Sequence, residues 1–459
     1  MKKIFALLLA LSLLLCAFAA CSSASDSTES GGAGSSGSSE STGSDATENP
    51  VTITWMTVNY NATEAALIQE NFIDPFEEEF PQYTIDMQMT PDVENVIKVQ
   101  LSAGEGADIF HLTAPAHAAE YARSGRLLSL ERYDEEYGWE DLMFQWAHDA
   151  SVVNGELYSV PMSYEAVVLY YRTDIFEENG WEFPETYEEL IDVCQKAQDA
   201  GLIPIAYGVN GFETSNDWYL SQVFNNYCGR QAVKDVLEGT AKFTDDIFVD
   251  AITRYNELWQ LGYIGNKQTH VVSNEEANSL FYSGKSAMLM TGTWLLAELN
   301  EMLPGLYSFG AHPGLRENQN SVVPLACSRS LGVNAVTEER GTTEGSVEFL
   351  NCMFNNKEGI AKVAAGGGMP LPTEIDKSYF GEDMNEMAMK SLDLLESASA
   401  NPETSGYAMW CFWPIDTQTY MTQNITNVFL GELTPEEYCA ESQKYMDQDL
   451  EAGNVPPIP

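Results

Sequence analysis

The apolar positions after residue 50 switch between the two-residue period of a strand and the longer period of a helix. A β-branched run at Val51–Val58 predicts a strand, and the alternation at Thr84–Met89 predicts a second one. A helix is predicted between them, whose apolar residues recur every three or four positions: Ala65, Ile68, Phe72 and Phe76. Pro75 is expected to kink or interrupt this helix, because proline has no N–H to donate. The order strand, helix, strand predicts parallel pairing.

The same alternation continues to the end of the chain. Ala107–Leu112 and Ile203–Tyr207 are predicted strands, and Ala287–Met290 is an apolar block typical of a strand buried on both faces. Two predicted helices begin with a capping box, in which a Thr and a Glu three residues later satisfy free backbone N–H groups: Thr186 with Glu189, and Thr434 with Glu437. The sequence therefore predicts an α/β fold with parallel-rich sheets.

The first 50 residues have the pattern of an export signal followed by a tether. Residues 1–20 carry two lysines, an apolar stretch and small residues before Cys21, as a bacterial lipoprotein signal does, so Cys21 is the predicted lipidation site. A cleaved leader with an incidental cysteine is the alternative. Residues 21–50 are rich in Ser and Gly, which predicts a lipidated cysteine and a flexible tether. We expect an extracellular protein, lipid-anchored at the outer face of the cell membrane of a Gram-positive bacterium.

Length and charge limit the classes of protein that fit. About four hundred residues remain beyond the tether, which suits two lobes better than one core. The formal net charge of −47 excludes nucleic acid as a partner, because its binding needs a basic surface. No later segment is apolar for long enough to span a bilayer. The cysteines after Cys21 are far apart, so buried free thiols are expected, with disulfides as the alternative.

Signatures of catalysis are missing from the sequence. It contains neither GxSxG nor HExxH, and its histidines have no metal-ligand spacing. Ser283–Ser286 resembles the end of a phosphate-binding loop, but Ser279 stands where that loop needs a glycine. Asp447–Asp449 hints at a calcium loop, whose required glycine is Ala452 in this chain. No enzymatic activity, metal site or cofactor is therefore predicted.

Five phrases in a fixed order carry a resemblance to a known family. They are ADIFHLTAPAHAAEYARSGRLLSLERY, NGELYSVPMSYEAVVLYYRTDIFEENG, PETYEELIDVCQKAQDAGLIPIAYG, FYSGKSAMLMTGTW and GELTPEEYCAESQKYMDQ. Together they resemble the extracellular solute-binding lipoproteins of ABC sugar importers, the family 1 solute-binding proteins that include the maltodextrin-binding proteins. The resemblance covers nearly all of residues 51–450.

The resemblance implies a two-lobed periplasmic-binding-protein fold of the Venus flytrap type, with a ligand cleft between the lobes. The implied division is an N-terminal lobe of residues 51–162 and 326–367, and a C-terminal lobe of residues 163–325 and 368–459. The chain is expected to cross between the lobes at Val160–Ser163 and again at Gly366–Pro370, where glycines and a proline suit a hinge.

Trp294 is the leading candidate for contact with a ligand. In open α/β sheets, ligands lie beyond the carboxyl ends of strands. Trp294 follows the predicted strand Ala287–Met290 after a sharp turn that Gly292 would allow. The resemblance places a sugar-stacking tryptophan here, where the flat CH face of a sugar can pack on an indole. A core tryptophan that caps the strand is the alternative.

The resemblance also supplies polar candidates. Glu165 matches a family position whose carboxylate accepts hydrogen bonds from hydroxyl groups, and Tyr164 lies beside it. A solvated loop acid is the alternative for Glu165. Asp217 and Trp218 are expected in a loop after a strand, where the family places another aromatic residue.

The remaining candidates lie at the two ends of the folded region. Trp410 and Trp413 precede the terminal helix, in a region that often forms an aromatic wall, and one of the two is expected to be core. Asn59 and Asn61 follow the first strand and could donate to hydroxyls, although simple turn residues fit nearly as well. Ala116–His117 stands where maltodextrin binders carry an acidic–basic pair, so maltose itself is not predicted.

The function implied by the resemblance is binding without chemistry. A lipid-anchored monomer would capture a carbohydrate, an oligosaccharide in particular, by closing its lobes, and would deliver it to the transmembrane permease subunits of an ABC transporter. The same fold with a peptide or polyamine ligand is one alternative, and a secreted glycoside hydrolase is another. The aromatic content and the acidity favour a neutral sugar, or a cation, over an anion.

Overall fold

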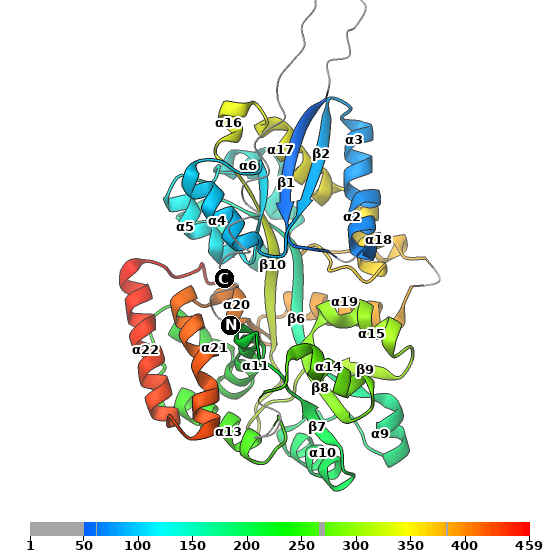
Figure 1. Ribbon diagram of the computed structural model, residues 1–459, viewed down its shortest axis with the longest axis vertical. Helices are drawn as coiled ribbons and strands as arrows, with labels where there is room; N and C mark the ends of the chain where they lie inside the picture. The colour runs from blue at the N-terminus through cyan, green and yellow to red at the C-terminus, as the bar shows by residue number, and fades with distance from the viewer. Residues whose placement is uncertain (1–49, 61, 266–270, 382–383) are drawn as a thin grey trace, which may run out of the picture. The chain divides into compact units, whose positions relative to one another are not determined.

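The computed structural model describes residues 50–60, 62–265, 271–381 and 384–459. The predicted leader, the lipidation site Cys21 and the candidate Asn61 lie outside the described residues. The described chain is an α/β structure with two lobes (Figure 1), which agrees with the predicted fold class.

The sheet of the upper lobe in Figure 1 begins with parallel strands. β1 (Val51–Thr57) lies between β2 (Tyr83–Met89) and β3 (Ile109–Leu112) and runs parallel to both. The ring of Trp55 on β1 packs against Phe349, with centroids 5.8 Å apart, in the apolar core of this lobe. The structure therefore confirms the first three predicted strands, to within two residues at their ends, and their parallel pairing.

Two long strands run between the lobes and pair antiparallel with each other. They are β6 (Val160–Arg172) and β10 (Val323–Val333). β10 also pairs antiparallel with β3, and β6 pairs antiparallel with β8 (Ser286–Gly292). The expectation of parallel-rich sheets is therefore wrong at the centre. Because the chain passes between the lobes in opposite directions along β6 and β10, these two strands pair antiparallel with each other.

The lower lobe adds short strands around β6 and β8. β7 (Ile203–Ala206) pairs parallel with β8, and β9 (Tyr307–Gly310) pairs antiparallel with β6. β11 (Ser405–Tyr407) pairs parallel with β10. All residues of β8 are buried, as the unbroken apolar block predicts for a strand covered on both faces. A separate hairpin consists of β4 (Val152–Val153) and β5 (Glu156–Leu157).

The first helical region is interrupted as its proline predicts. α2 (Ala62–Ile68) is followed by the wider turn η1 (Gln69–Ile73), and α3 (Asp74–Glu79) begins after it. The N–H of Asp74 donates to the carbonyl of Gln69, five residues back, instead of four. Pro75 lies at the start of α3, where its missing N–H is tolerated. The predicted helix is therefore interrupted by a π-type turn just before Pro75.

Both predicted capping boxes are present. α10 (Tyr187–Asp199) begins after Thr186, whose hydroxyl accepts from the N–H of Glu189 at 3.3 Å while that glutamate accepts from the N–H of Thr186 at 3.1 Å. The same reciprocal pair precedes α22 (Pro435–Ala452). Each box satisfies backbone donors that the first turn of a helix leaves free.

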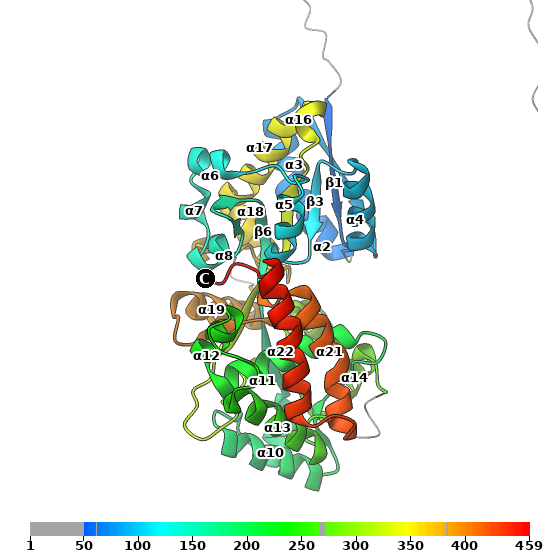
Figure 2. The same ribbon diagram turned by 90° about the vertical axis from the view of Figure 1, so that its left-hand side faces the viewer.

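Helices cover the faces of the sheet in each lobe, and α21 and α22 lie side by side (Figure 2). The upper lobe contains α4 (Val93–Ala103), η2 (Pro115–His117), α5 (Ala118–Arg123), α6 (Glu131–Tyr137), α7 (Trp139–Leu142), α8 (Gln145–Asp149), α16 (Thr337–Arg340), α17 (Thr343–Asn355) and α18 (Lys357–Ala365). The lower lobe contains α9 (Thr173–Asn179), η3 (Glu213–Ser215), α11 (Asn216–Cys228), α12 (Arg230–Leu237), α13 (Asp246–Gln260), α14 (Asn274–Tyr282), η4 (Thr293–Leu295), α15 (Leu296–Met302), α19 (Glu386–Ala400), α20 (Met409–Phe412) and α21 (Ile415–Leu430). The short turn η5 (Lys377–Tyr379) precedes α19. Within the described ranges, no helix combines the length and the hydropathy that a membrane span needs.

A third passage follows α18 at the predicted glycine-rich stretch. Gly367 has φ of 87°, a left-handed conformation that favours glycine, and a Cβ there would lie 3.0 Å from the Cβ of Ala297. The N–H of Tyr164 on β6 donates to the carbonyl of Pro370 at 2.9 Å, which ties this passage to the strand. The lobe boundaries given above stay a prediction.

Candidate ligand-binding cleft

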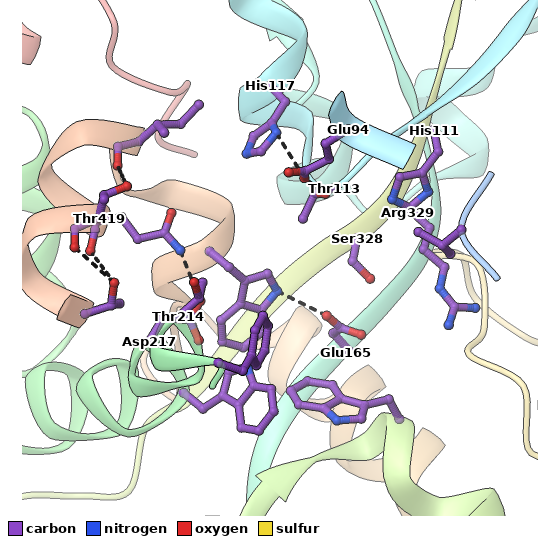
Figure 3. A pocket seen from close by; sticks show the side chains of 18 of the residues that line it. Glu94, His111, Thr113, His117, Glu165, Thr214, Asp217, Ser328, Arg329 and Thr419 are labelled. Carbon is purple, nitrogen blue, oxygen red and sulfur yellow. Dashed lines mark hydrogen bonds and ion pairs between the residues drawn. The ribbon is translucent and has the colours of Figure 1, made fainter. Parts of the chain in front are cut away.

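A cavity with a volume of about 810 Å³ is lined by residues from both lobes (Figure 3). From the upper lobe come side chains after β1 and around α4, β3 and η2; from the lower lobe come those of η3, α11, η4, α20 and α21. β6 and β10 contribute Glu165, Ser328 and Arg329 where the two strands pass between the lobes.

Four aromatic side chains of the lower lobe form a connected row along this cavity. The ring of Trp218 lies 6.4 Å from Phe212 and 5.0 Å from Trp294, measured between centroids. Trp294 in turn meets Trp410 edge-on at 5.9 Å. Phe212 is exposed, Trp218 and Trp294 are half-buried, and Trp410 is buried. The row therefore offers an apolar wall with indole faces available to a ligand.

Gly292 lets the indole ring of Trp294 pack directly against the backbone at the end of β8. Its φ of −90° is ordinary extended backbone, so the sharp turn expected at Gly292 is wrong. A Cβ at this position would lie 1.9 Å from the six-membered ring of Trp294, because the indole folds back over the end of β8. Only a residue without a side chain leaves that space free.

Glu165 is a buried carboxyl at the bottom of the cleft. Its Oε1 accepts a hydrogen bond from Nε1 of Trp410 at 3.1 Å (Figure 3). Burial raises the pKa of Glu165 to about 7, although the charge of Arg329 and the hydrogen bonds from Ser328 and Trp410 oppose this. Near neutral pH, Glu165 is therefore poised between a hydrogen-bond donor and an ionised acceptor.

Asp217 is a second buried carboxyl in the same cavity. It lies in the first turn of α11, and its Oδ2 accepts from the amide of Gln418 at 3.0 Å. Its Oδ1 is buried and meets no hydrogen-bond partner in the described chain. Burial raises the pKa of Asp217 well above its usual value, while hydrogen bonds from Gln418 and from the backbone N–H of Trp218 to the carboxyl oppose the rise and the charge of Glu165 adds to it. A buried oxygen without a hydrogen bond destabilises the folded protein, unless a ligand donates a hydrogen bond to it.

Arg329 is a functional candidate that the sequence reasoning missed. It interrupts the strand conformation of β10 with φ of 52°, which is uncommon for a residue other than glycine and marks a strained position. Its guanidinium pairs with the carboxylate of Glu64 on α2 and lies 4.9 Å above the ring of Tyr60. A lone arginine within an otherwise uncharged strand was the available signal.

The upper wall of the cleft is polar, and its residues were also missed. His111 on β3 is buried, and its Nδ1 finds no partner among the described residues. Burial lowers the pKa of His111 to about 3, helped by the charges of Arg329 and His117, so its imidazole is neutral. Burial also lowers the pKa of His117, against the carboxylate of Glu94, whose Oε1 lies 3.8 Å from Nδ1 of His117. Glu94 also accepts a hydrogen bond from Thr113.

Two predicted ligand-binding residues lie away from the cleft. Tyr164 is fully buried and packs on Phe144, with centroids 5.5 Å apart, because successive side chains of a strand point to opposite faces and Glu165 occupies the cleft side. Trp413 is fully buried and stacks on Phe224, so of the two tryptophans near the terminal helix Trp410 is the one in the cleft.

Asn59, Asp217 and Trp218, which were also predicted to bind the ligand, line the cavity. Asn59 is exposed and lines the cavity. Trp218 lines it too, but it belongs to the first turn of α11 and not to a loop, as does Asp217. In the described ranges, no group of three His, Cys, Asp or Glu side chains is placed to hold a metal ion. The cleft thus combines indole faces with buried hydrogen-bonding groups from both lobes.

Residues 60–359 match the family model described as bacterial extracellular solute-binding protein. Because this match spans more than half of the chain, the chain belongs to that family, in agreement with the resemblance.

Curated relatives and solved structures add detail. The chain is 24% identical over 315 residues to the multiple sugar-binding protein of Streptococcus mutans, covering 66% of this chain and 71% of that protein. It is 24% identical over 235 residues to the maltotriose-binding protein of Pyrococcus abyssi, covering 48% of this chain and 45% of that protein. A structure of a chitin oligosaccharide binding protein superposes with a TM-score of 0.74 at 21% identity, covering 87% of this chain and 99% of that one. The structural likeness concerns the fold.

Proposed function

We propose that this protein captures an oligosaccharide in the cleft and delivers it to the permease of an ABC transporter, without performing chemistry on it. The observation that carries the proposal is the row of Trp218, Trp294 and Trp410 beside buried polar atoms of both lobes. A sugar presents apolar CH faces and hydroxyls that both donate and accept. The indoles suit the faces, while Glu165 and Asp217 suit the hydroxyls.

The names of the sequence relatives support this ligand class. One is called a multiple sugar-binding protein and another a maltotriose-binding protein. The second name indicates a sugar longer than one unit, and a cavity of about 810 Å³ has room for several sugar rings. We therefore expect an oligosaccharide to bind more tightly than its monosaccharide.

Lobe closure is the proposed means of capture. Contacts from His111 and Asn59 lie on the upper wall, and those from the tryptophans lie on the lower wall. Only a closed arrangement lets one sugar touch both walls, so a ligand that makes both sets of contacts stabilises the closed form. The permease would recognise that form.

The test of the ligand class is a titration panel. Purified residues 50–459 are screened by thermal shift, and hits are measured by calorimetry, with glucose-based, xylose-based and galactose-based mono- and oligosaccharides, together with spermidine and a tetrapeptide. Saturable binding of an oligosaccharide that remains intact by chromatography is expected. Binding of spermidine or the peptide alone would assign another solute to the cleft, and release of shorter sugars would mean a hydrolase.

The lipid anchor at Cys21 is proposed from the leader pattern alone. Cys21→Ala is expected to release the full-length protein from the membrane fraction into the medium, because acylation requires that thiol. Cys16→Ala is the matched control and should leave the protein attached. Retention of the Cys21→Ala protein on membranes would contradict the anchor while leaving the proposed binding intact.

A further inference from the structure

The charges that line the cleft are strongly unbalanced. Four acidic residues contribute to its walls, namely Glu64, Glu94, Glu165 and Asp217. Of the described lining residues, only Arg329 carries a fixed positive charge, and its guanidinium is paired with Glu64. Burial lowers the pKa of the neighbouring imidazoles of His111 and His117, which disfavours their charged forms. The cleft therefore contains more carboxyl groups than its single fixed cation can pair with.

Two of these carboxyls are buried and stand beside the tryptophan row. Glu165 shares Oε1 with the indole N–H of Trp410. Asp217 precedes Trp218 in the chain and keeps Oδ1 without a partner although the residue is only 2% exposed. Both carboxyls line the same cavity, and the charge of Glu165 contributes to the raised pKa of Asp217. A buried acceptor without a donor, next to aromatic faces, indicates a ligand group that donates and carries positive charge.

We propose that the oligosaccharide recognised by this cleft carries a free amino group, which binds as an ammonium ion to Asp217 and Glu165 against the tryptophan row. This inference rests on the proposed sugar-binding function and specifies the sugar class. An ammonium group offers three donors and no acceptor, which matches two ionised carboxylates that offer acceptors only. A hydroxyl would leave part of that acceptor capacity unused.

The aromatic row adds to the selectivity. A cation within about 6 Å of an indole face is attracted by the negative face of the ring. Trp218 and Trp294 meet at 5.0 Å with their planes tilted by 56°, so together they form a corner with two such faces. A neutral N-acetyl group in the same place would bring a carbonyl oxygen towards the carboxylates, and that contact is repulsive.

The test compares three tetrasaccharides with the same linkage, made of glucosamine, N-acetylglucosamine and glucose. Calorimetric titration is run below the pKa of the amino sugar and at about 0.15 M salt, where exposed charges beyond roughly 8 Å are screened. The glucosamine tetrasaccharide is expected to bind at least about tenfold more tightly than the other two, which corresponds to about 1.4 kcal/mol. Repeating the titration in buffers of different ionisation enthalpy should reveal proton release with this ligand alone, because an ammonium ion favours ionised carboxylates.

Charge-removing variants identify the groups responsible. Asp217→Asn and Glu165→Gln keep the shape of the side chain, and each is expected to reduce the preference for the glucosamine tetrasaccharide over its N-acetylated form by about tenfold. Asp447→Asn is the matched control, because Asp447 is exposed on α22 and contacts Gln443. It removes one charge from the same acidic protein and should leave the preference unchanged. Circular dichroism and thermal unfolding verify that each variant is folded.

The outcomes separate this inference from the function on which it rests. Equal or tighter binding of the glucose or N-acetylglucosamine tetrasaccharide would overturn the ammonium assignment while supporting sugar binding. Loss of the preference in Asp447→Asn as well would attribute it to overall charge and would also overturn the assignment. Failure of the three tetrasaccharides with tight binding of spermidine would overturn both, because the cleft would then select cations without sugar.

Discussion

Trp294 and Trp413 show how burial separates two side chains that look alike in the sequence. Both follow a short apolar stretch and both were candidates for sugar stacking. Trp413 stacks on Phe224 within the core of the lower lobe, while Trp294 is half-buried and faces the cavity between Trp218 and Trp410. The two tryptophans therefore provide a matched pair for testing what each position does.

Replacing Trp294 by Ala is expected to cost about 2 to 4 kcal/mol of ligand affinity, as loss of a central aromatic contact does. The change should lower the free energy of unfolding only slightly, because Trp294 is half-buried. Trp413→Ala should instead lower the free energy of unfolding by about 3–5 kcal/mol. Calorimetric titration and urea unfolding measure both quantities on both variants. Normal affinity in a destabilised Trp294→Ala protein would contradict the stacking role.

The pKa of Glu165 predicts a pH dependence of stability. The folded state raises this pKa from 4.5 to about 7 because the carboxyl is buried, so folding favours the protonated form. Below pH 4.5 the carboxyl is protonated in both states, so its titration does not change the stability. As the pH rises from 4.5 to 7, the unfolded chain loses this proton before the folded protein does, and the folded protein loses roughly 3 kcal/mol of stability in total.

Glu165→Gln should therefore be about as stable as the wild type near pH 4 and roughly 3 kcal/mol more stable above pH 7. Urea unfolding of the ligand-free proteins across this range measures the difference, in which the titration of all other groups cancels. A difference that does not change with pH would contradict the buried, protonated state of Glu165.

The residues missed by sequence reasoning have a physical explanation. His111 and Arg329 lie within strands that otherwise consist of uncharged residues, and a pattern search assigns such strands to the core. Their position in the cleft depends on how β3, β6 and β10 are arranged next to one another, and the periodicity within a strand does not predict that arrangement. Glu165 and Trp294 were found because the resemblance supplied the tertiary context that local periodicity lacks.

At the scale of elements, signals that act over a few residues were the most reliable. The capping boxes at Thr186 and Thr434 and the interruption near Pro75 appear where the sequence predicts them. The antiparallel pairing of β6 with β10 was not predicted, because these strands are more than 150 residues apart and no local pattern states their direction. Strand partners are decided by the path of the whole chain.

Gly292 links an element to the site. Gly292→Ala is expected to weaken ligand binding nearly as much as Trp294→Ala, because the new methyl group would occupy the place of the indole ring. The backbone at φ of −90° accepts alanine, so the loss should come from the displaced ring. Gly381→Ala is the matched control, since a Cβ there meets nothing within 4 Å.

A double-mutant cycle makes this prediction specific. Once Trp294 is Ala, adding Gly292→Ala should cost no further affinity, because the two changes remove the same contact. Calorimetry on the two single variants and the double variant gives the coupling. Additive losses would mean that Gly292 supports ligand binding by a route other than the position of Trp294.

At the scale of the whole molecule, the passages between the lobes are the structural basis for closure. β6 and β10 pair across the passage, and Ser163 there bonds to the carbonyl of Ser328 at 3.0 Å. Beyond α22, the C-terminal segment also reaches the upper lobe, where Arg123 donates to the carbonyl of Gly453 at 2.6 Å and to Asn454 at 2.9 Å. Closure must accommodate both connections, which favours a bend within the strands over separation of the lobes.

We expect a sugar to be captured by closure of the two lobes. To move the lobes from mostly open to mostly closed, a ligand must favour the closed form by roughly 5.5 kcal/mol, which a few stacking contacts and charge-assisted hydrogen bonds can supply. Small-angle X-ray scattering of residues 50–459, with and without a saturating concentration of the oligosaccharide that binds most tightly, tests this directly. A smaller radius of gyration is expected in the bound state. An unchanged scattering profile at full occupancy would contradict capture by lobe closure.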